Sequence, residues 1–227
     1  MTKKNCMTCN SKFDAEEVVI MGKSISFQNY CDDCLEKNIT KSEQDAAQLR
    51  KDALERCFWE SVPPLYQDTE IERLNPILVQ NVLTWEFNPI GIGIRGKSGE
   101  QKTRAAVLIL HKMKMTGKSV YFLKSTDIAK YSAQQFSNEK ELQSDALKAI
   151  RSAHTAQVLL IDDIGKGRLS PAAEELLYDL LDRRSERQLP VIWTSNAVQG
   201  ELHKMLSNDR GDAIIRRLSE FSTLITL

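Results

Sequence analysis

The chain has 227 residues, of which 41% are hydrophobic and 27% charged, the balance of an ordinary globular protein. Its 31 basic and 31 acidic residues cancel, which excludes a uniformly basic nucleic-acid-binding surface and leaves only a local patch for contact with DNA. The longest apolar run, 105–110, is far shorter than the roughly 20 residues that cross a bilayer, and no secretory signal is visible. We expect a cytoplasmic protein with no membrane partner.

Four of the five cysteines form two Cys-x-x-Cys pairs, Cys6 with Cys9 and Cys31 with Cys34. Two such pairs around a short hairpin can present four thiolates to Zn²⁺ in tetrahedral geometry, although the spacer slightly exceeds the usual length of roughly 15–20 residues. Incidental or redox thiols are the alternative, but a segment with so small a core needs a metal to fold. We predict a zinc module over residues 1–37 that binds a protein, with nucleic acid as the alternative partner.

Residues 38–83 are predicted to be a helical linker that leads into the main domain. A helix is expected over residues 40–61, with Thr40 as its N-cap and an apolar stripe that places Cys57 in a core. Prolines end this helix, and a second, shorter helix is expected to begin near Pro76.

Strand and helix patterns alternate in the remaining segment, residues 84–227. The expected strands are 90–94, 119–123, 158–161, 190–194 and 223–227. Because these strands are almost continuously apolar, they predict a parallel sheet that helices cover on both faces. The fold class is therefore α/β, with three layers and five parallel strands.

A glycine-rich turn between the first strand and the first helix has the composition of a phosphate-binding loop. The strict pattern G-x-x-x-x-G-K-S occurs at 91–98, where it would interrupt the strand. A second register, 96–103, follows the strand and opens an unbroken helix, with Gln101 in place of the last glycine. We prefer the second register. Gln101 can crowd the loop or need a positive φ, so a plain strand-to-helix turn is the alternative.

In this register the loop would bind ATP. The Lys102 ammonium would contact the β- and γ-phosphates, and the Thr103 hydroxyl would ligate Mg²⁺. Two carboxylates end the third strand: Asp162 would hold Mg²⁺ through water, and Asp163 would polarise the attacking water. The predicted nucleotide-binding residues are Gly96, Ser98, Gly99, Glu100, Gln101, Lys102, Thr103 and Arg104.

Four motifs, in order, resemble those of the DnaC/IstB branch of AAA+ ATPases, which contains replicative helicase loaders and transposition helpers. The motifs are the loop at 96–103, the stretch Leu160–Gly165, the stretch Arg184–Asn196 and the segment Gly211–Leu218. The resemblance covers about residues 91–227. It implies a P-loop ATPase domain of the AAA+ type without the C-terminal helical lid that many AAA+ proteins carry.

The resemblance also implies roles for residues outside the loop. Asn196 would orient the attacking water beside Asp163, and Arg217 would be an arginine finger that completes the site of a neighbouring subunit. The adjacent Arg216 is a second candidate for the finger, and an ordinary exposed arginine is the alternative. Arg184 is a weaker intersubunit candidate, with a surface charge as the alternative.

The function implied by the resemblance is a slow ATPase that self-associates, binds a hexameric replicative DNA helicase and helps to place it on single-stranded DNA. The implied cofactors are ATP, Mg²⁺ and Zn²⁺. A transposition helper of the same fold and an adaptor with a degenerate nucleotide site are the alternatives. For contact with DNA backbone the sequence offers the basic helix end at Lys112, Lys114 and Lys118, for which simple solvation is the favoured alternative.

Overall fold

The computed structural model describes residues 2–20, 23–197, 201–206 and 210–227. The chain divides into two compact units, Met1–Ala53 and Leu54–Leu227. The division at residues 37 and 83 stays a prediction. Phe58, Val62 and the helix that contains Leu78 pack in one core with the sheet of the second unit. In the part of the chain that the structure describes, no helix is long and apolar enough to cross a membrane.

The first unit contains two antiparallel hairpins. Strand β1 (Thr2–Asn5) pairs with β2 (Lys12–Ala15), and β3 (Val18–Ile20) pairs with β4 (Lys23–Ile25). The second hairpin lies between the two cysteine pairs, as the sequence predicts. The first hairpin was not predicted, because its strands are short and mostly exposed and therefore lack a clear apolar alternation.

Helix α1 (Asp32–Ser61) begins earlier than the sequence predicts. Thr40 lies inside the helix, where its hydroxyl donates to the Glu36 carbonyl at 2.9 Å, so the predicted N-cap at Thr40 is wrong. Asp32 and Asp33 occupy the first turn instead, where their negative charges interact favourably with the helix dipole.

The apolar stripe of α1 does not form a continuous core contact. Cys57 is exposed, so its predicted burial is wrong, whereas the next residue, Phe58, is buried. The helix end packs through aromatic rings: Trp59 stacks on His111, with ring centroids 5.0 Å apart. The periodicity of the sequence predicted the apolar face of α1. It did not show which turns of the helix have a partner to pack against.

The second unit is built on a parallel sheet of five strands in the order β6-β7-β8-β5-β9. The strands are β5 (Gly91–Arg95), β6 (Val120–Lys124), β7 (Val158–Asp162), β8 (Val191–Ser195) and β9 (Ser222–Thr226). This sheet confirms the predicted α/β class and the five parallel strands.

Short turns and helices precede the sheet and connect its strands. The elements are η1 (Pro64–Tyr66), η2 (Ile71–Arg73), α2 (Pro76–Thr84), α3 (Lys102–Met115), α4 (Ser125–Gln134), α5 (Lys140–Thr155), α6 (Pro171–Glu186), α7 (Glu201–Met205) and α8 (Arg210–Glu220). Two of them begin at N-cap residues whose side chains accept a hydrogen bond. The Asn75 side chain accepts from the Ile77 N–H at α2, and the Ser170 side chain accepts from the Ala173 N–H at α6.

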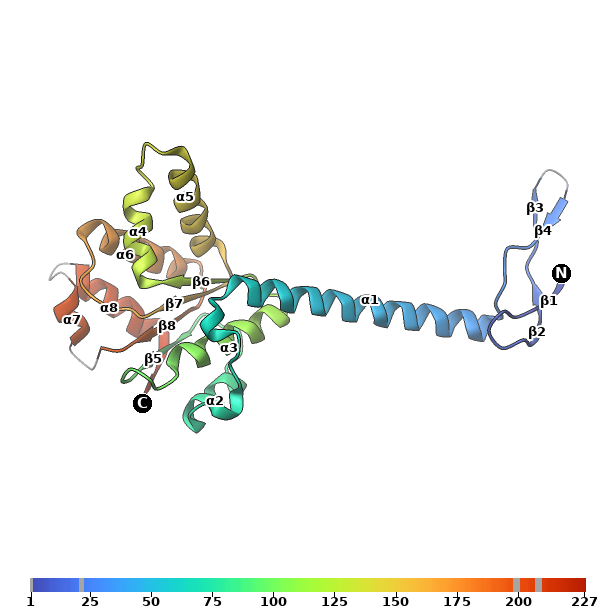
Figure 1. The fold of residues 1–227 in the computed structure, drawn as a ribbon, viewed down its shortest axis with the longest axis horizontal. Coiled ribbons are helices and arrows are strands. Elements are labelled where there is room, and N and C mark those ends of the chain that lie inside the picture. Colours follow the sequence, from blue (N-terminus) through green and yellow to red (C-terminus); the bar gives the residue numbers. More distant parts are fainter. Residues whose placement is uncertain (1, 21–22, 198–200, 207–209) are drawn as a thin grey trace. The chain divides into compact units, whose positions relative to one another are not determined.

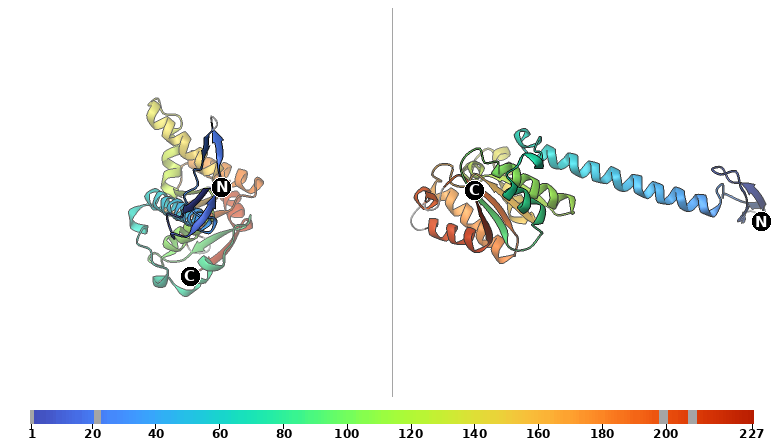
Figure 2. Two further views of the ribbon diagram at one scale, coloured as in Figure 1. Left: turned by 90° about the vertical axis from the view of Figure 1, so that its right-hand side faces the viewer. Right: turned by 90° about the horizontal axis from the view of Figure 1, so that it is seen from below.

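The two faces of the sheet carry different helices, which gives the three layers visible in Figures 1 and 2. On β7, Val158 and Leu160 pack in the core that contains α3, whereas Leu159 and Ile161 pack in the core that contains α4, α6 and α8. Alternate residues of one strand therefore face two buried layers, which explains why residues 158–161 are all apolar.

Candidate functional site

The glycine-rich turn occupies the second of the two predicted registers. Strand β5 ends at Arg95, and α3 begins at Lys102, so residues 96–101 form the loop between them. The earlier glycines serve packing. A Cβ at Gly91 would lie 1.9 Å from the Val191 carbonyl oxygen, and one at Gly93 would lie 2.3 Å from the ring of Trp193. The strict G-x-x-x-x-G-K-S match is therefore a property of a tightly packed strand.

Gln101 adopts the left-handed conformation that the missing glycine would favour, with φ at 60°. It is the residue before α3, and its side chain makes no capping hydrogen bond. The first N–H groups of a helix have no partner inside the helix and point toward its N-terminus. The loop and the start of α3 thus have the backbone geometry of a phosphate-binding site, with a side chain at the position where glycine is usual.

Lys102 is the buried cation of this loop. Its side chain is 5% exposed, and its ammonium donates to the Lys97 carbonyl at 2.6 Å. Burial lowers the pKa of Lys102, and the negative charges of Glu100, Asp163 and Asp162 oppose that shift. A buried cation among free N–H groups is the chemistry that binds phosphate oxygens.

Asp162, at the end of β7, lies beside the start of α3. It is 2% exposed, and its Oδ1 accepts from the Thr103 hydroxyl and from the Thr194 hydroxyl, each at 2.7 Å. Burial raises the pKa of Asp162, and these two hydrogen bonds oppose the rise. A hydroxyl and a carboxylate at this separation are oxygen ligands of the kind that Mg²⁺ prefers, so Thr103 and Asp162 fit the predicted metal site.

Asp163 and Asn196 meet across two strands. The Asn196 amide donates to Asp163 Oδ1 at 3.2 Å, and the Lys166 ammonium lies 3.2 Å from Oδ2. Asp163 has φ at 59°, and its backbone N–H donates to the Thr194 hydroxyl at 2.9 Å. The Thr194 hydroxyl therefore holds the Asp162 carboxylate and the Asp163 backbone. The sequence analysis missed it, although Thr194 lies two residues before Asn196 in the motif quoted for that residue.

These residues line a cavity of about 400 Å³. Its lining residues are Leu65, Tyr66, Ser98, Gly99, Gln101, Lys102, Thr103, Arg104, Asp163, Lys166 and Asn196. The predicted loop residues from Ser98 onward, except Glu100, therefore meet Asp163 and Asn196 at one place, whereas Gly96 does not line the cavity. Leu65 and Tyr66 were not predicted, because they belong to η1, which carries no motif. Burial, and then the charge of Asp162, raise the pKa of the Tyr66 hydroxyl.

Arg217 does not lie at this cavity. Its guanidinium is paired with Asp182 of α6 and lies 3.9 Å from Glu220. The neighbouring Arg216 is more exposed and forms only a 3.9 Å pair with Glu220. Both placements are compatible with action on a second subunit, and neither shows it.

Arg184 is neither a surface charge nor an intersubunit residue, so both predictions for it are wrong. The side chain is fully buried. Its guanidinium donates to the carbonyls of Ala153 and Ala156 and to that of Pro190, each at 2.8 Å. Burial lowers the pKa of Arg184 to about 10. The guanidinium satisfies backbone oxygens where α5, β7 and β8 meet, a role that becomes visible only in three dimensions.

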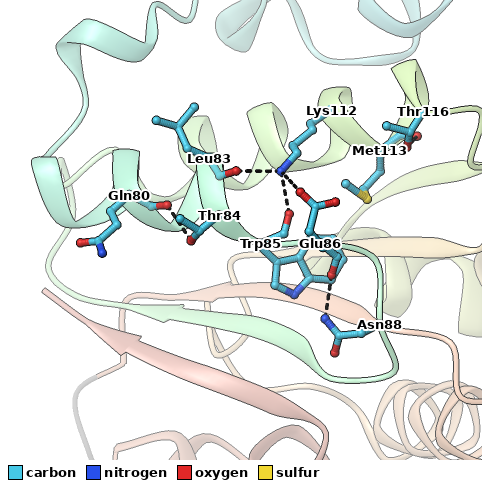
Figure 3. A network of polar contacts seen from close by, with 9 residues as sticks. All are labelled: Gln80, Leu83, Thr84, Trp85, Glu86, Asn88, Lys112, Met113 and Thr116. Carbon is cyan, nitrogen blue, oxygen red and sulfur yellow. Dashed lines mark hydrogen bonds and ion pairs between the residues drawn. The ribbon is translucent and has the colours of Figure 1, made fainter.

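The basic end of α3 is largely occupied by contacts within the chain. Figure 3 shows the Lys112 ammonium donating to the carbonyls of Leu83 and Trp85, each at 2.8 Å, and to Glu86 at 2.9 Å. The Lys118 ammonium lies 4.3 Å from the centre of the Phe87 ring. All three donors of Lys112 are thus used around the end of α2, which argues against both a contact of this residue with DNA and the favoured alternative of simple solvation.

The four paired cysteines come together in the first unit. The sulfur atoms of Cys6, Cys9, Cys31 and Cys34 all lie within 4.8 Å of one another, and those of Cys9 and Cys31 are 3.7 Å apart. Tetrahedral Zn–S bonds of about 2.3 Å imply sulfur–sulfur distances of about 3.8 Å. Interactions with the neighbouring thiols raise the pKa of Cys34 to about 12, which makes its thiolate costly to form. A bound cation would stabilise the thiolate and remove that cost. The cluster therefore fits a small zinc module.

The comparison with protein families finds a match over most of the second unit. The sequence model described as "IstB-like ATP binding protein" matches residues 68–227. Among curated proteins, the replicative helicase loader DnaC of Escherichia coli (strain K12) is 24% identical over 176 residues. This alignment covers 73% of this chain and 69% of that protein.

Several solved structures have a similar fold. A DnaI structure has a TM-score of 0.57 at 18% identity and covers 73% of this chain and 94% of its own. A DnaC helicase loader has a TM-score of 0.54 at 21% identity, with 73% and 99% covered. AMPPCP-bound DnaA from Aquifex aeolicus has a TM-score of 0.52 at 17% identity, with 66% of this chain and only 44% of that chain covered. At these identities the likeness shows the fold alone.

Proposed function

Since the chain belongs to the IstB-like ATP binding protein family, we propose that it is an ATP-hydrolysing helicase loader. In this proposal it binds a hexameric replicative DNA helicase and helps to place it on single-stranded DNA. The observation that carries the ATPase part is the cavity where Lys102 and Thr103 meet Asp163 and Asn196. The helicase part is supported by the similarity to proteins named replicative helicase loader DnaC.

The residues of the cavity divide the proposed hydrolysis between them. The loop N–H groups and Lys102 would bind the phosphates, and Thr103 with Asp162 would hold the Mg²⁺ that neutralises phosphate charge. Asp163 would accept a proton from the attacking water, which Asn196 would orient. Lys166 pairs with Asp163 at 3.2 Å and would have to release that carboxylate before it could act on water. Such a step agrees with slow hydrolysis.

We propose that an arginine of α8 completes the site of a neighbouring subunit. Arg217 is tied to Asp182, whereas Arg216 is more exposed, so both are tested by mixing subunits. A Lys102→Ala subunit should not bind ATP but still supplies the arginine. An arginine variant should bind ATP but supplies no arginine. ATP hydrolysis should return when Lys102→Ala subunits are mixed with subunits in which the arginine finger is replaced, because each subunit supplies what the other lacks. If neither Arg216→Ala nor Arg217→Ala mixtures recover activity although mixed oligomers form, neither residue acts between subunits.

A helicase-loading assay tests the whole proposal. The substrate is DNA coated with single-strand-binding protein, and the helicase comes from the same host. The wild-type protein should stimulate loading, and ATP should change its affinity for helicase or DNA by a coupling of about 1–3 kcal/mol. Lys102→Ala should lose the ATP effect. We propose that the cysteine module carries the helicase contact, so a full-length variant with Ser at Cys31 and Cys34 should lose helicase binding and keep nucleotide binding.

A transposition helper is the second candidate, and the description of the matching family favours it. Failure to stimulate the helicase, together with co-purification with a transposase, would establish that alternative. The left-handed Gln101 keeps a third candidate, an adaptor with a degenerate nucleotide site. Absence of ATP binding by the wild-type protein, with partner binding intact, would support the adaptor.

A further inference from the structure

The Glu100 side chain folds back onto the first residue of the phosphate loop. Its Oε2 lies 2.0 Å from the position that a Cβ on Gly96 would take, so any other residue at position 96 would displace the carboxylate. This oxygen is buried and has no hydrogen-bond partner. In the part of the chain that the structure describes, no lysine or arginine forms an ion pair with the carboxylate. Glu100 therefore places an unpaired negative charge in the loop.

That charge acts on the cation that would meet the phosphates. Among the carboxylates around Lys102, Glu100 contributes most to holding its pKa up, ahead of Asp163 and Asp162, while burial acts more strongly in the opposite direction. The Lys102 ammonium thus already interacts electrostatically with three carboxylates. Phosphate oxygens that approach the loop meet attraction from one buried cation and repulsion from all three anions.

We propose that the Glu100 carboxylate opposes the binding of metal-free nucleotide and makes this site selective for the Mg²⁺ complex. The inference rests on the proposed ATP site. Free ATP carries a charge of about −4 and its Mg²⁺ complex about −2, so a fixed anion repels the complex with about half the energy. Asp162 gains a cation as its neighbour when the complex binds, whereas the buried Glu100 Oε2 has no hydrogen-bond partner in the described structure and stays a source of repulsion.

A purely structural role for Glu100 makes a different prediction. If the side chain only fills the space beside Gly96 and Leu227, its replacement changes the loop in the same way for every ligand. If its charge matters, the effect of replacement grows with the charge of the ligand and falls as salt screens it. A charge series of ligands therefore separates the two roles without any measurement of hydrolysis.

The experiment compares Glu100→Gln with wild type by titration calorimetry against ATP, ADP and AMP in EDTA, and against ATP with excess Mg²⁺. We expect Glu100→Gln to bind free ATP about ten-fold more tightly than wild type and the Mg²⁺ complex about three-fold more tightly. The two gains in binding free energy then stand in the ratio of the ligand charges, about two to one. The gain should shrink from ATP to ADP to AMP. Glu141→Gln, which changes the net charge equally at an exposed position of α5, should bind like wild type.

Glu100→Asp keeps the charge and is expected to show no such gain. An equal gain for all ligands, or weaker binding by Glu100→Gln, would overturn the inference, with the thermal melt of each variant confirming that it is folded. Measurable binding of the Mg²⁺ complex by wild type supports the proposed function whatever Glu100 does. If neither wild type nor Glu100→Gln binds any nucleotide, the proposed function fails and the inference fails with it.

Discussion

The nucleotide site and the cysteine module are built on opposite physical principles. At the nucleotide site, Thr103, Asp162 and Thr194 come from three elements far apart in sequence, and a buried parallel sheet holds them at hydrogen-bond distance. In the described part of the first unit, the buried apolar side chains are those of Cys6, Ala15 and Cys34. One site thus rests on a hydrophobic core, and the other has few buried side chains beside a cysteine cluster that fits a metal. Perturbations should therefore affect the two units separately.

Removal of a cysteine ligand should have the largest effect. Cys31→Ser is expected to abolish zinc binding and unfold the module, because structural zinc sites contribute about 10–16 kcal/mol of apparent binding energy at pH 7. The melting transition of the second unit should stay where it is. Elemental analysis and amide exchange measure the two effects, and Cys57→Ser should keep one zinc per chain. A wild-type protein purified without chelator that contains no metal would contradict the prediction.

Two neighbouring lysines test how the packed unit builds its site. Lys102→Ala should weaken ATP binding by about 100-fold or more, because it removes the buried cation that faces the phosphates. Lys97→Ala should retain most of the affinity, since Lys97 is exposed and its carbonyl, rather than its side chain, accepts from Lys102. Fluorescent-nucleotide binding measures both. If Lys97→Ala proves the more damaging change, the strict register at 91–98 is the phosphate loop after all.

Replacing Arg184, whose guanidinium is buried, tests how much its hydrogen bonds to backbone carbonyls stabilise the second unit. Arg184→Ala should lower the free energy of unfolding by about 3–5 kcal/mol, because it leaves several buried carbonyls without a donor. Arg183→Ala is the matched control. Its side chain is exposed and pairs with Asp179, so we expect a loss below about 1 kcal/mol. Urea unfolding followed by tryptophan fluorescence compares the two variants. Similar losses in the free energy of unfolding would refute a stabilising role of the hydrogen bonds from Arg184 to the buried carbonyls.

The smallest expected effect is a pH dependence confined to the second unit. Burial lowers the pKa of His111 and of His154, and nearby carboxylates only partly offset it. As the pH falls, these histidines take up protons near pH 6.5 in the unfolded chain but only at a lower pH in the folded chain. The free energy of unfolding should therefore fall as the pH drops from about 7.5 toward about 5.5. His111→Phe should reduce this slope and keep a ring against Trp59. A stability that rises on acidification would contradict the burial argument.

Sequence patterns located the turn between β5 and α3 because its position depends on local features. A strand must end and a helix must begin around the glycines, and both signals lie within about a dozen residues of one another. The same local reading anticipated a positive φ at Gln101, which the structure has. It also located the four cysteines that the structure brings together. The roles of these residues in binding ATP and zinc remain proposals.

By itself, the sequence determined the α/β class, the five strands, the start of α2 near Pro76 and the order of the site motifs, because periodicity and short spacings encode them. Only the tertiary structure decided which side chains meet. It buried Arg184 among backbone carbonyls, directed Lys112 to the end of α2, exposed Cys57 and placed Thr194 between the Asp162 carboxylate and the Asp163 backbone N–H. A side chain's environment depends on partners that are distant in the chain, and no local pattern contains that information.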